Sequence, residues 1–222
     1  MSTSLTAIDA IERHLGPLSG KHLLDVGCGS GALRMKIENL GASWTGLEPF
    51  SDGADKGIIK APAQEMPFPD ARFDGVIFVN SLHHVPTEQM KAALSEAARV
   101  LSDHGRIVVI EPEIEGALSE VVAVVDDEAQ IRTNAQTALD DVIRDGLLSE
   151  AATQRYVRTE RYRSFDEFCQ KISTVSPERA DLISRRADAL KHAFEVRAIV
   201  GGAAWLLTQP MLVRVLERSR PR

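Results

Sequence analysis

The sequence predicts an α/β fold with a doubly wound, mostly parallel sheet. Short apolar runs recur through the first half of the chain, and amphipathic segments of helical period separate them. The 222 residues are 44% hydrophobic and 26% charged, which is the make-up of an average globular domain. Strands that alternate with helices are joined by right-handed crossovers, so their carboxyl ends meet at one edge of the sheet, where ligands bind.

The elements of the first half follow in this alternating order. Thr6 and Asp9 are spaced to cap a helix over 6–15, which a Gly-Pro pair ends. Pro86 suits the first turn of a longer helix, which an apolar stripe carries to near Gly105. The other predicted elements are strands over 22–26, 43–48, 58–60, 73–79 and 106–111, and a helix over 31–40.

The second half is less regular. Apolar stripes over 114–150 predict two helices or one bent helix, broken near Thr133-Asn134. The remaining predicted elements are a strand over 155–163, helices that open at Ser164 and Pro177, and a last strand over 211–216. The sheet would then have seven strands.

Charge and composition exclude several classes of protein. A formal net charge of −6 gives no general attraction to nucleic acid, and the arginines between Arg155 and Arg163 are better explained as a solvated strand face. With only Cys28 and Cys169, a disulfide framework is not expected, which suits a reducing cytoplasm. No apolar run reaches the ~18 residues that a membrane span needs, and no secretion signal opens the chain. We expect a cytoplasmic protein.

The segment after the first strand carries the strongest functional signal. Asp25 ends an apolar run and is followed by Gly27, Gly29 and Gly31, which predict a turn where side chains would obstruct the backbone or a ligand. Glu48 closes the second strand, where a carboxylate can accept hydrogen bonds from both hydroxyls of a ribose. Together they predict an adenosine-bearing ligand.

Four segments occur in a diagnostic order: Leu24-Asp25-Val26-Gly27-Cys28-Gly29-Ser30-Gly31, Glu48-Pro49, Met66-Pro67-Phe68-Pro69-Asp70 with Phe73-Asp74, and Leu82-His83-His84-Val85. In this order they resemble the motifs of class I S-adenosylmethionine-dependent methyltransferases, nearest to the type 11 and quinone-biosynthesis branch. Four ordered motifs are far more specific than one glycine loop. The resemblance covers residues 20–113 and implies a Rossmann-like sheet of seven strands whose last strand is antiparallel, with a helical lid insertion.

The resemblance also implies a cofactor site for S-adenosylmethionine. The residues that it assigns to this site are Asp25, Gly27, Gly29, Gly31, Glu48, Ala63, Gln64 and Asn80. The glycines would meet the methionyl part and the ribose, and Glu48 would bind the ribose hydroxyls. Asp25 and the carbonyl of Asn80 would lie near the methionyl amine, and Ala63 with Gln64 beside the adenine.

Two features depart from the family pattern. Pro62 stands where relatives usually have an acidic residue for the adenine amino group, so Gln64 or a backbone carbonyl must substitute. Residues 51–57 have the composition of a turn where the family has a helix.

A dinucleotide-binding domain is the main structural alternative, since it also combines a glycine turn with a later acid. Here the glycines run G-x-G-x-G rather than G-x-G-x-x-G, and the alternative does not account for the histidine motif.

Methyl transfer by in-line displacement mainly requires alignment and exclusion of water, so a base is optional. His83 and His84 are candidate catalytic bases at the rim of the sheet, while packing is an equal alternative. Glu111 is better explained as a capping or solvated residue than as a substrate contact. We expect no metal, because neighbouring histidines in a loop seldom point together and no further ligand has suitable spacing. Cys28 is expected to fill space in the turn.

The expected organisation is one domain over 1–222, with a cofactor half at 1–113 and an acceptor half at 114–222. The insertion at 114–150 is expected to cover a small apolar or aromatic acceptor, although its stripes equally suit a homodimer face or ordinary packing on the core. The functional alternative is a non-catalytic protein that binds S-adenosylmethionine as a regulator or partner subunit.

Overall fold

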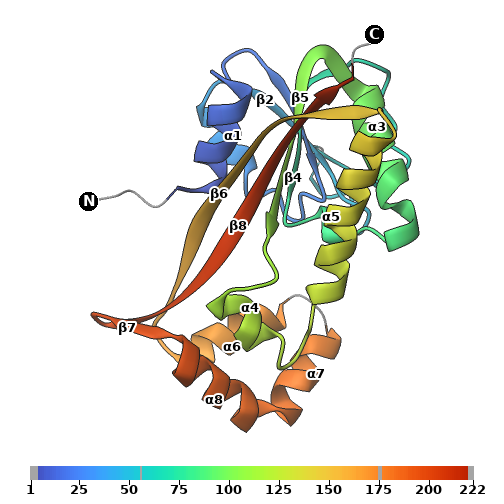
Figure 1. The fold of residues 1–222 in the computed structure, drawn as a ribbon. Helices are drawn as coiled ribbons and strands as arrows, with labels where there is room; N and C mark the ends of the chain where they lie inside the picture. The colour runs from blue at the N-terminus through green and yellow to red at the C-terminus, as the bar shows by residue number, and fades with distance from the viewer. Residues whose placement is uncertain (1–4, 56, 175–176, 220–222) are drawn as a thin grey trace. The chain divides into compact units, whose positions relative to one another are not determined.

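In the computed structural model, which describes residues 5–55, 57–174 and 177–219, the strands form one sheet. Its order is β3-β2-β1-β4-β5-β8-β6, with β7 paired to β8 (Figure 1). The strands are β1 His22–Val26, β2 Ser43–Leu47, β3 Ile58–Ile59, β4 Phe73–Val79, β5 Leu101–Pro112, β6 Leu148–Tyr162, β7 Ile199–Gly201 and β8 Ala204–Arg218. The predicted α/β fold is confirmed.

Pairing along the first five strands is parallel throughout, as predicted. The last strand, β8, pairs antiparallel with β7. The described residues contain eight strands rather than the predicted seven, because the turn at Gly202, whose φ is 65°, lets Ile199–Gly201 fold back on β8 as an added short strand. β8 is also one long strand that begins before the predicted residue 211.

The described residues also form α-helices and short 3₁₀ turns. They are α1 Ala7–Leu15, α2 Arg34–Asn39, α3 Met90–Val100, α4 Ala117–Val122, α5 Ala129–Arg144, α6 Phe165–Ser173, α7 Pro177–Arg185 and α8 Ala187–Arg197, with 3₁₀ turns η1 Leu82–His84 and η2 Thr87–Gln89. The predicted capping box of α1 is present, since Thr6 and Asp9 each bond the other's main-chain N–H. Ser164 caps α6 through the N–H of Glu167.

Several predicted boundaries were wrong. α3 ends at Val100 and not near Gly105, which lies inside β5. The reason is tertiary: a Cβ on Gly105 would lie 2.9 Å from the carbonyl oxygen of Asp74, so the glycine serves a close, bulged pairing of β5 with β4. The break in the insertion lies between α4 and α5 rather than at Thr133-Asn134, and the helix from Pro177 is interrupted at Arg186.

The described chain divides into two compact units. The sheet unit comprises residues 5–111, 131–155 and 212–219, and the helical unit comprises 112–130 and 156–211. Every residue that the sequence analysis assigned to the cofactor site belongs to the sheet unit. The expectation of one domain, with a cofactor half and an acceptor half, stays a prediction.

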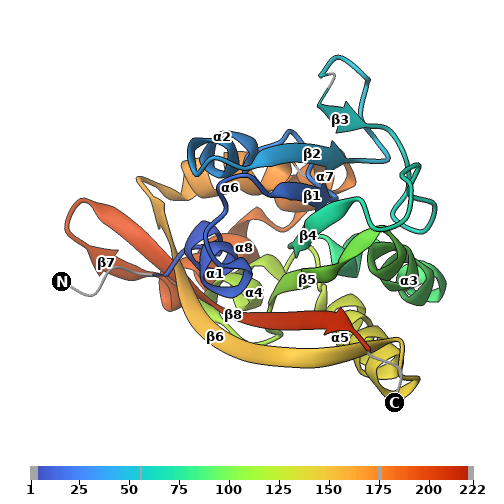
Figure 2. The same cartoon turned by 90° about the horizontal axis from the view of Figure 1, so that it is seen from above.

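The sheet unit has helices on both faces of its strands (Figure 2). α3 and α5 bury Leu94, Leu139 and other apolar side chains against β1, β4 and β5. α1 covers the opposite face, where Leu15 packs closely on Gly75 of β4. A Cβ added to Gly75 would lie 2.7 Å from the Leu15 side chain. This two-sided burial explains why the strands are nearly continuous apolar runs.

The helical unit has its own core of aromatic rings. Tyr162, Phe168 and Phe194 are buried and have ring centroids 5.0 to 6.2 Å apart, with Trp205 packed on Phe194. α4, α6 and α8 supply the aliphatic side chains around them. Within the described ranges, no helix has both the length and the apolar character to cross a bilayer.

Candidate functional site

The glycine turn follows β1 at the point where the strand order reverses. β1 lies between β2 and β4 in the sheet. The chain runs outward from β1 to β2 and β3, and then crosses back to place β4 on the other side of β1. In doubly wound sheets such a switch point opens a crevice at the carboxyl ends of the strands. Gly27, Gly29 and Gly31 have φ values of 69°, 54° and 78°, the left-handed region that favours glycine.

Gly27 also permits a close approach to the end of β4. A Cβ at this position would lie 2.6 Å from Cβ of Ser81, whereas nothing lies within 4 Å of a Cβ at Gly29. Ser81 is buried, and its hydroxyl donates a hydrogen bond to the carbonyl of Val26 at 2.6 Å. The turn is therefore packed on one side and open at Gly29, as a cradle for a ligand requires.

Glu48 is held directly against this turn. Its main-chain N–H donates to Ile59 of β3 at 3.0 Å, which fixes the end of β2. One carboxylate oxygen accepts from the N–H of Gly29 at 3.0 Å, and the other accepts from the N–H of Phe50 at 3.1 Å. The two parts of the predicted adenosine site thus meet.

Asp25 lies beneath the turn and only 3% of it is exposed. Its carboxyl accepts a hydrogen bond from Nε1 of Trp44 at 3.2 Å. Burial raises the pKa of Asp25 from 3.8 to about 7, and the Trp44 hydrogen bond opposes that shift. Sequence reasoning missed Trp44 as a supporting residue; the signal was a large aromatic residue in β2, the strand that pairs beside β1.

The packing around the glycine turn also determines the pKa of the Cys28 thiol. Burial, followed by the charges of Asp25 and Glu48, raises the pKa of its thiol to about 12. A thiol with so little thiolate is a poor nucleophile, which agrees with its expected role of filling space.

Asn80 leaves β4 with a φ of 52°, an uncommon conformation for a residue other than glycine. Its main-chain N–H donates to the carbonyl of Ile110 at 2.9 Å. Among the described residues its buried side-chain oxygen has no hydrogen-bond partner. A buried acceptor of this kind next to the glycine turn suits a ligand with an N–H donor.

The part of the predicted cofactor site that would bind adenine has fewer distinctive contacts. Ala63 is buried in the core of the sheet unit, so a ligand at this position would meet its main chain, while Gln64 is half-buried. Residues 51–55 and 57 contain no helix, as predicted. Asp55 anchors this loop through two hydrogen bonds from Arg34, at 2.9 and 3.0 Å.

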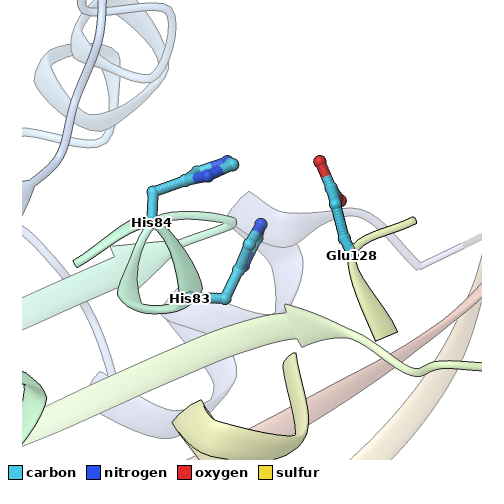
Figure 3. A group of neighbouring side chains, drawn as sticks. All are labelled: His83, His84 and Glu128. Atoms are coloured by element: carbon cyan, nitrogen blue, oxygen red, sulfur yellow. The ribbon is translucent and has the colours of Figure 1, made fainter. Parts of the chain in front are cut away.

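His83 and His84 follow each other on η1, with ring centroids 4.0 Å apart (Figure 3). Their environments differ: His83 is 3% exposed, whereas His84 is exposed. Glu111, at the end of β5, is 1% exposed and forms a short hydrogen bond with Nδ1 of His83. It also accepts from the N–H groups of Ser81 and Leu82, at 3.2 and 2.9 Å, which is the capping role that was expected.

Comparison with known proteins finds relatives of part of this chain. Residues 24–109 match the model of a methyltransferase domain. The chain is 37% identical over 106 residues to 27-O-demethylrifamycin SV methyltransferase of Amycolatopsis mediterranei, covering 41% of this chain and 38% of that protein. It is 34% identical over 107 residues to a demethylmenaquinone methyltransferase of Tropheryma whipplei, covering 44% of each. The chain thus spans less than half the length of these relatives.

Structural similarity extends beyond the matched segment. Geranyl diphosphate C-methyltransferase of Streptomyces coelicolor, solved with Mg²⁺, geranyl diphosphate and S-adenosyl-L-homocysteine, superposes with a TM-score of 0.54 at 16% identity. The superposition covers 95% of this chain and 77% of that one. Residues 24–109 are therefore similar to a methyltransferase domain, and the chain shares its overall fold with a solved methyltransferase.

Proposed function

We propose that this protein binds S-adenosylmethionine and transfers its methyl group to a small-molecule acceptor. The observation that carries the proposal is the contact of the Glu48 carboxylate with the Gly29 N–H at the switch point of the sheet. It puts the acid that would bind a ribose within one hydrogen bond of the glycine turn.

The residues present fit this cofactor. Glu48 has two carboxylate oxygens that can accept from ribose hydroxyls, and the turn leaves open space at Gly29. The buried oxygen of Asn80 can accept from an ammonium group. Asp25, in its ionised form, adds negative charge beneath the turn. When bound, S-adenosylmethionine would supply an activated methyl group on a sulfonium centre.

The chain's own residues would align the reactants and handle the proton. Glu48 and the glycine turn would fix the nucleoside, and Asn80 would orient the amino acid part. His83 is the better of the two candidate bases because a buried carboxylate fixes its ring, while His84 is exposed. A base is needed only where the acceptor carries a proton.

Apolar acceptors are the class that the relatives support. Their names specify a rifamycin derivative and a demethylmenaquinone, and the structural neighbour was solved with geranyl diphosphate. These are small molecules with large apolar or aromatic parts. We infer an acceptor of this class for this chain and no nucleic-acid substrate, in keeping with the net charge of −6.

Two measurements test the proposal. Calorimetry should show S-adenosylhomocysteine binding to the wild type and weakening by about 10- to 100-fold in Glu48→Ala, since charge-assisted hydrogen bonds are lost. Glu12→Ala, an exposed change on α1, should leave binding unchanged. Incubation with methyl-labelled S-adenosylmethionine and a panel of quinones, phenols and isoprenoids should then label an acceptor. Failure of the wild type to bind the cofactor product would overturn the proposal, and binding without any labelled acceptor would favour a regulatory protein.

A further inference from the structure

Glu111 makes a set of contacts that a capping role alone does not require. One carboxylate oxygen accepts from both main-chain N–H groups at the start of η1, those of Ser81 and Leu82. The second oxygen faces Nδ1 of His83. Glu111 and His83 are both almost fully buried.

These contacts determine which ring nitrogen carries the proton. When the Glu111 carboxylate is ionised it has no proton to donate, so Nδ1 of His83 is then the donor in the bond between them. In the neutral ring the lone pair then belongs to Nε2. The two main-chain donors hold the carboxylate in place, so neither partner can rotate away without leaving a buried polar group unsatisfied.

We propose that Glu111 is a positioning residue that holds His83 as the tautomer whose basic atom is Nε2. The inference deepens the proposed function and rests on it for its chemical use. In that use, Nε2 of His83 takes a proton from the acceptor, whose freed electron pair forms the bond to the methyl carbon while the carbon–sulfur pair returns to sulfur. The resulting imidazolium is stabilised by the adjacent Glu111 carboxylate.

The purely structural alternative is that Glu111 only caps η1. The variant Glu111→Gln separates the two because it preserves the cap. Its amide oxygen can still accept from Ser81 and Leu82, and its NH₂ group then replaces the oxygen that faces Nδ1. Nδ1 must then become the acceptor, so the proton moves to Nε2. A cap without a positioning role would leave the tautomer unaffected.

Histidine-selective ¹⁵N NMR of the full chain at about pH 8.5, well above the ordinary pKa of an imidazole, tests this directly. His83→Gln identifies the His83 signals among the six histidines of the chain. We expect the Nδ1–H form of His83 to exceed the Nε2–H form at least about tenfold in the wild type, and the preference to reverse in Glu111→Gln. Glu88→Gln, an exposed carboxylate of η2, is the matched control and should leave the signals unchanged.

The outcomes separate this proposal from the proposed function. An Nε2–H tautomer in the wild type, or an unchanged tautomer in Glu111→Gln, would overturn the positioning role. The wild-type spectrum decides the matter even if the variant fails to fold. Calorimetry with S-adenosylhomocysteine on the same samples tests the cofactor site independently, since the ring tautomer is read without any ligand.

Discussion

Glu48 accepts a hydrogen bond from the main-chain N–H of Gly29, at 3.0 Å, across the end of two parallel strands. The bond joins an acid directly after β2 to a turn after β1, and the two residues are 19 apart in the chain. It shows that the carboxylate is oriented toward the turn by the protein itself. Little reorganisation of the carboxylate would then be needed for it to accept from the hydroxyls of a ribose.

Replacing Glu48 with Gln tests the ribose contact more finely than truncation does. The amide keeps one acceptor but adds a donor, so affinity for S-adenosylhomocysteine should fall by about tenfold. The loss should be smaller when the ligand is its 2′-deoxy analogue, because the mutation and the missing hydroxyl remove the same bond. Equal losses for both ligands, measured by calorimetry, would place Glu48 away from the 2′-hydroxyl.

Asp25 should make stability depend on pH. Its pKa is about 7 in the folded protein against 3.8 ordinarily, so the folded state binds the proton more tightly. The stabilisation is therefore complete below about pH 4 and is lost as pH rises to about 7, with a total on the order of 4 kcal/mol. Asp25→Asn keeps an acceptor for Trp44 and should remove this slope.

Urea unfolding of wild type and Asp25→Asn between about pH 4 and 8 measures the effect. The variant should be the more stable protein at the alkaline end, yet bind S-adenosylmethionine more weakly because the negative charge beneath the turn is lost. Asp52→Asn, in the exposed loop after β2, serves as the control. Stability curves that run parallel for wild type and Asp25→Asn would refute the raised pKa.

Gly27 and Gly29 should respond differently to alanine although both have positive φ. Gly27→Ala adds a clash with Cβ of Ser81 to the backbone strain and should cost about 2 to 4 kcal/mol of unfolding free energy. Gly29→Ala meets no atom within 4 Å and should cost about 1 kcal/mol. The double variant Gly27→Ala, Ser81→Gly should be more stable than the sum of the single changes predicts. Additive effects in denaturant titrations would show that the two positions do not collide.

Gln209 should be essential to the helical unit. The side chain is 1% exposed; its amide donates to the carbonyls of Glu113 and Glu115, and its oxygen accepts from the N–H and hydroxyl of Ser119 at the start of α4. Gln209→Ala removes these four part-buried hydrogen bonds at once and should destabilise the unit by about 3 kcal/mol. Gln170→Ala, exposed on α6, should have little effect in the same thermal melt. A wild-type melting temperature for Gln209→Ala would contradict this account.

Local signals in the sequence were sufficient for much of the fold. The capping box of Thr6 and Asp9 and the parallel pairing of the first five strands were correct because each depends on neighbouring residues or on a simple alternation. The end of α3 was wrong because the close pairing of Gly105 with β4 overrode the helical stripe. The lid or dimer role of residues 114–150 stays a prediction.

By itself the sequence determined that this chain has a parallel sheet, a glycine turn and an acid in register with it, since spacing along a strand is a local property. Only the tertiary structure decided that Trp44 bonds Asp25, that Ser81 packs against Gly27 and that Glu111 clamps His83 rather than His84. Those partners lie 19 to 54 residues apart in the chain. Their contact depends on how parallel strands align, which no short pattern of residues encodes.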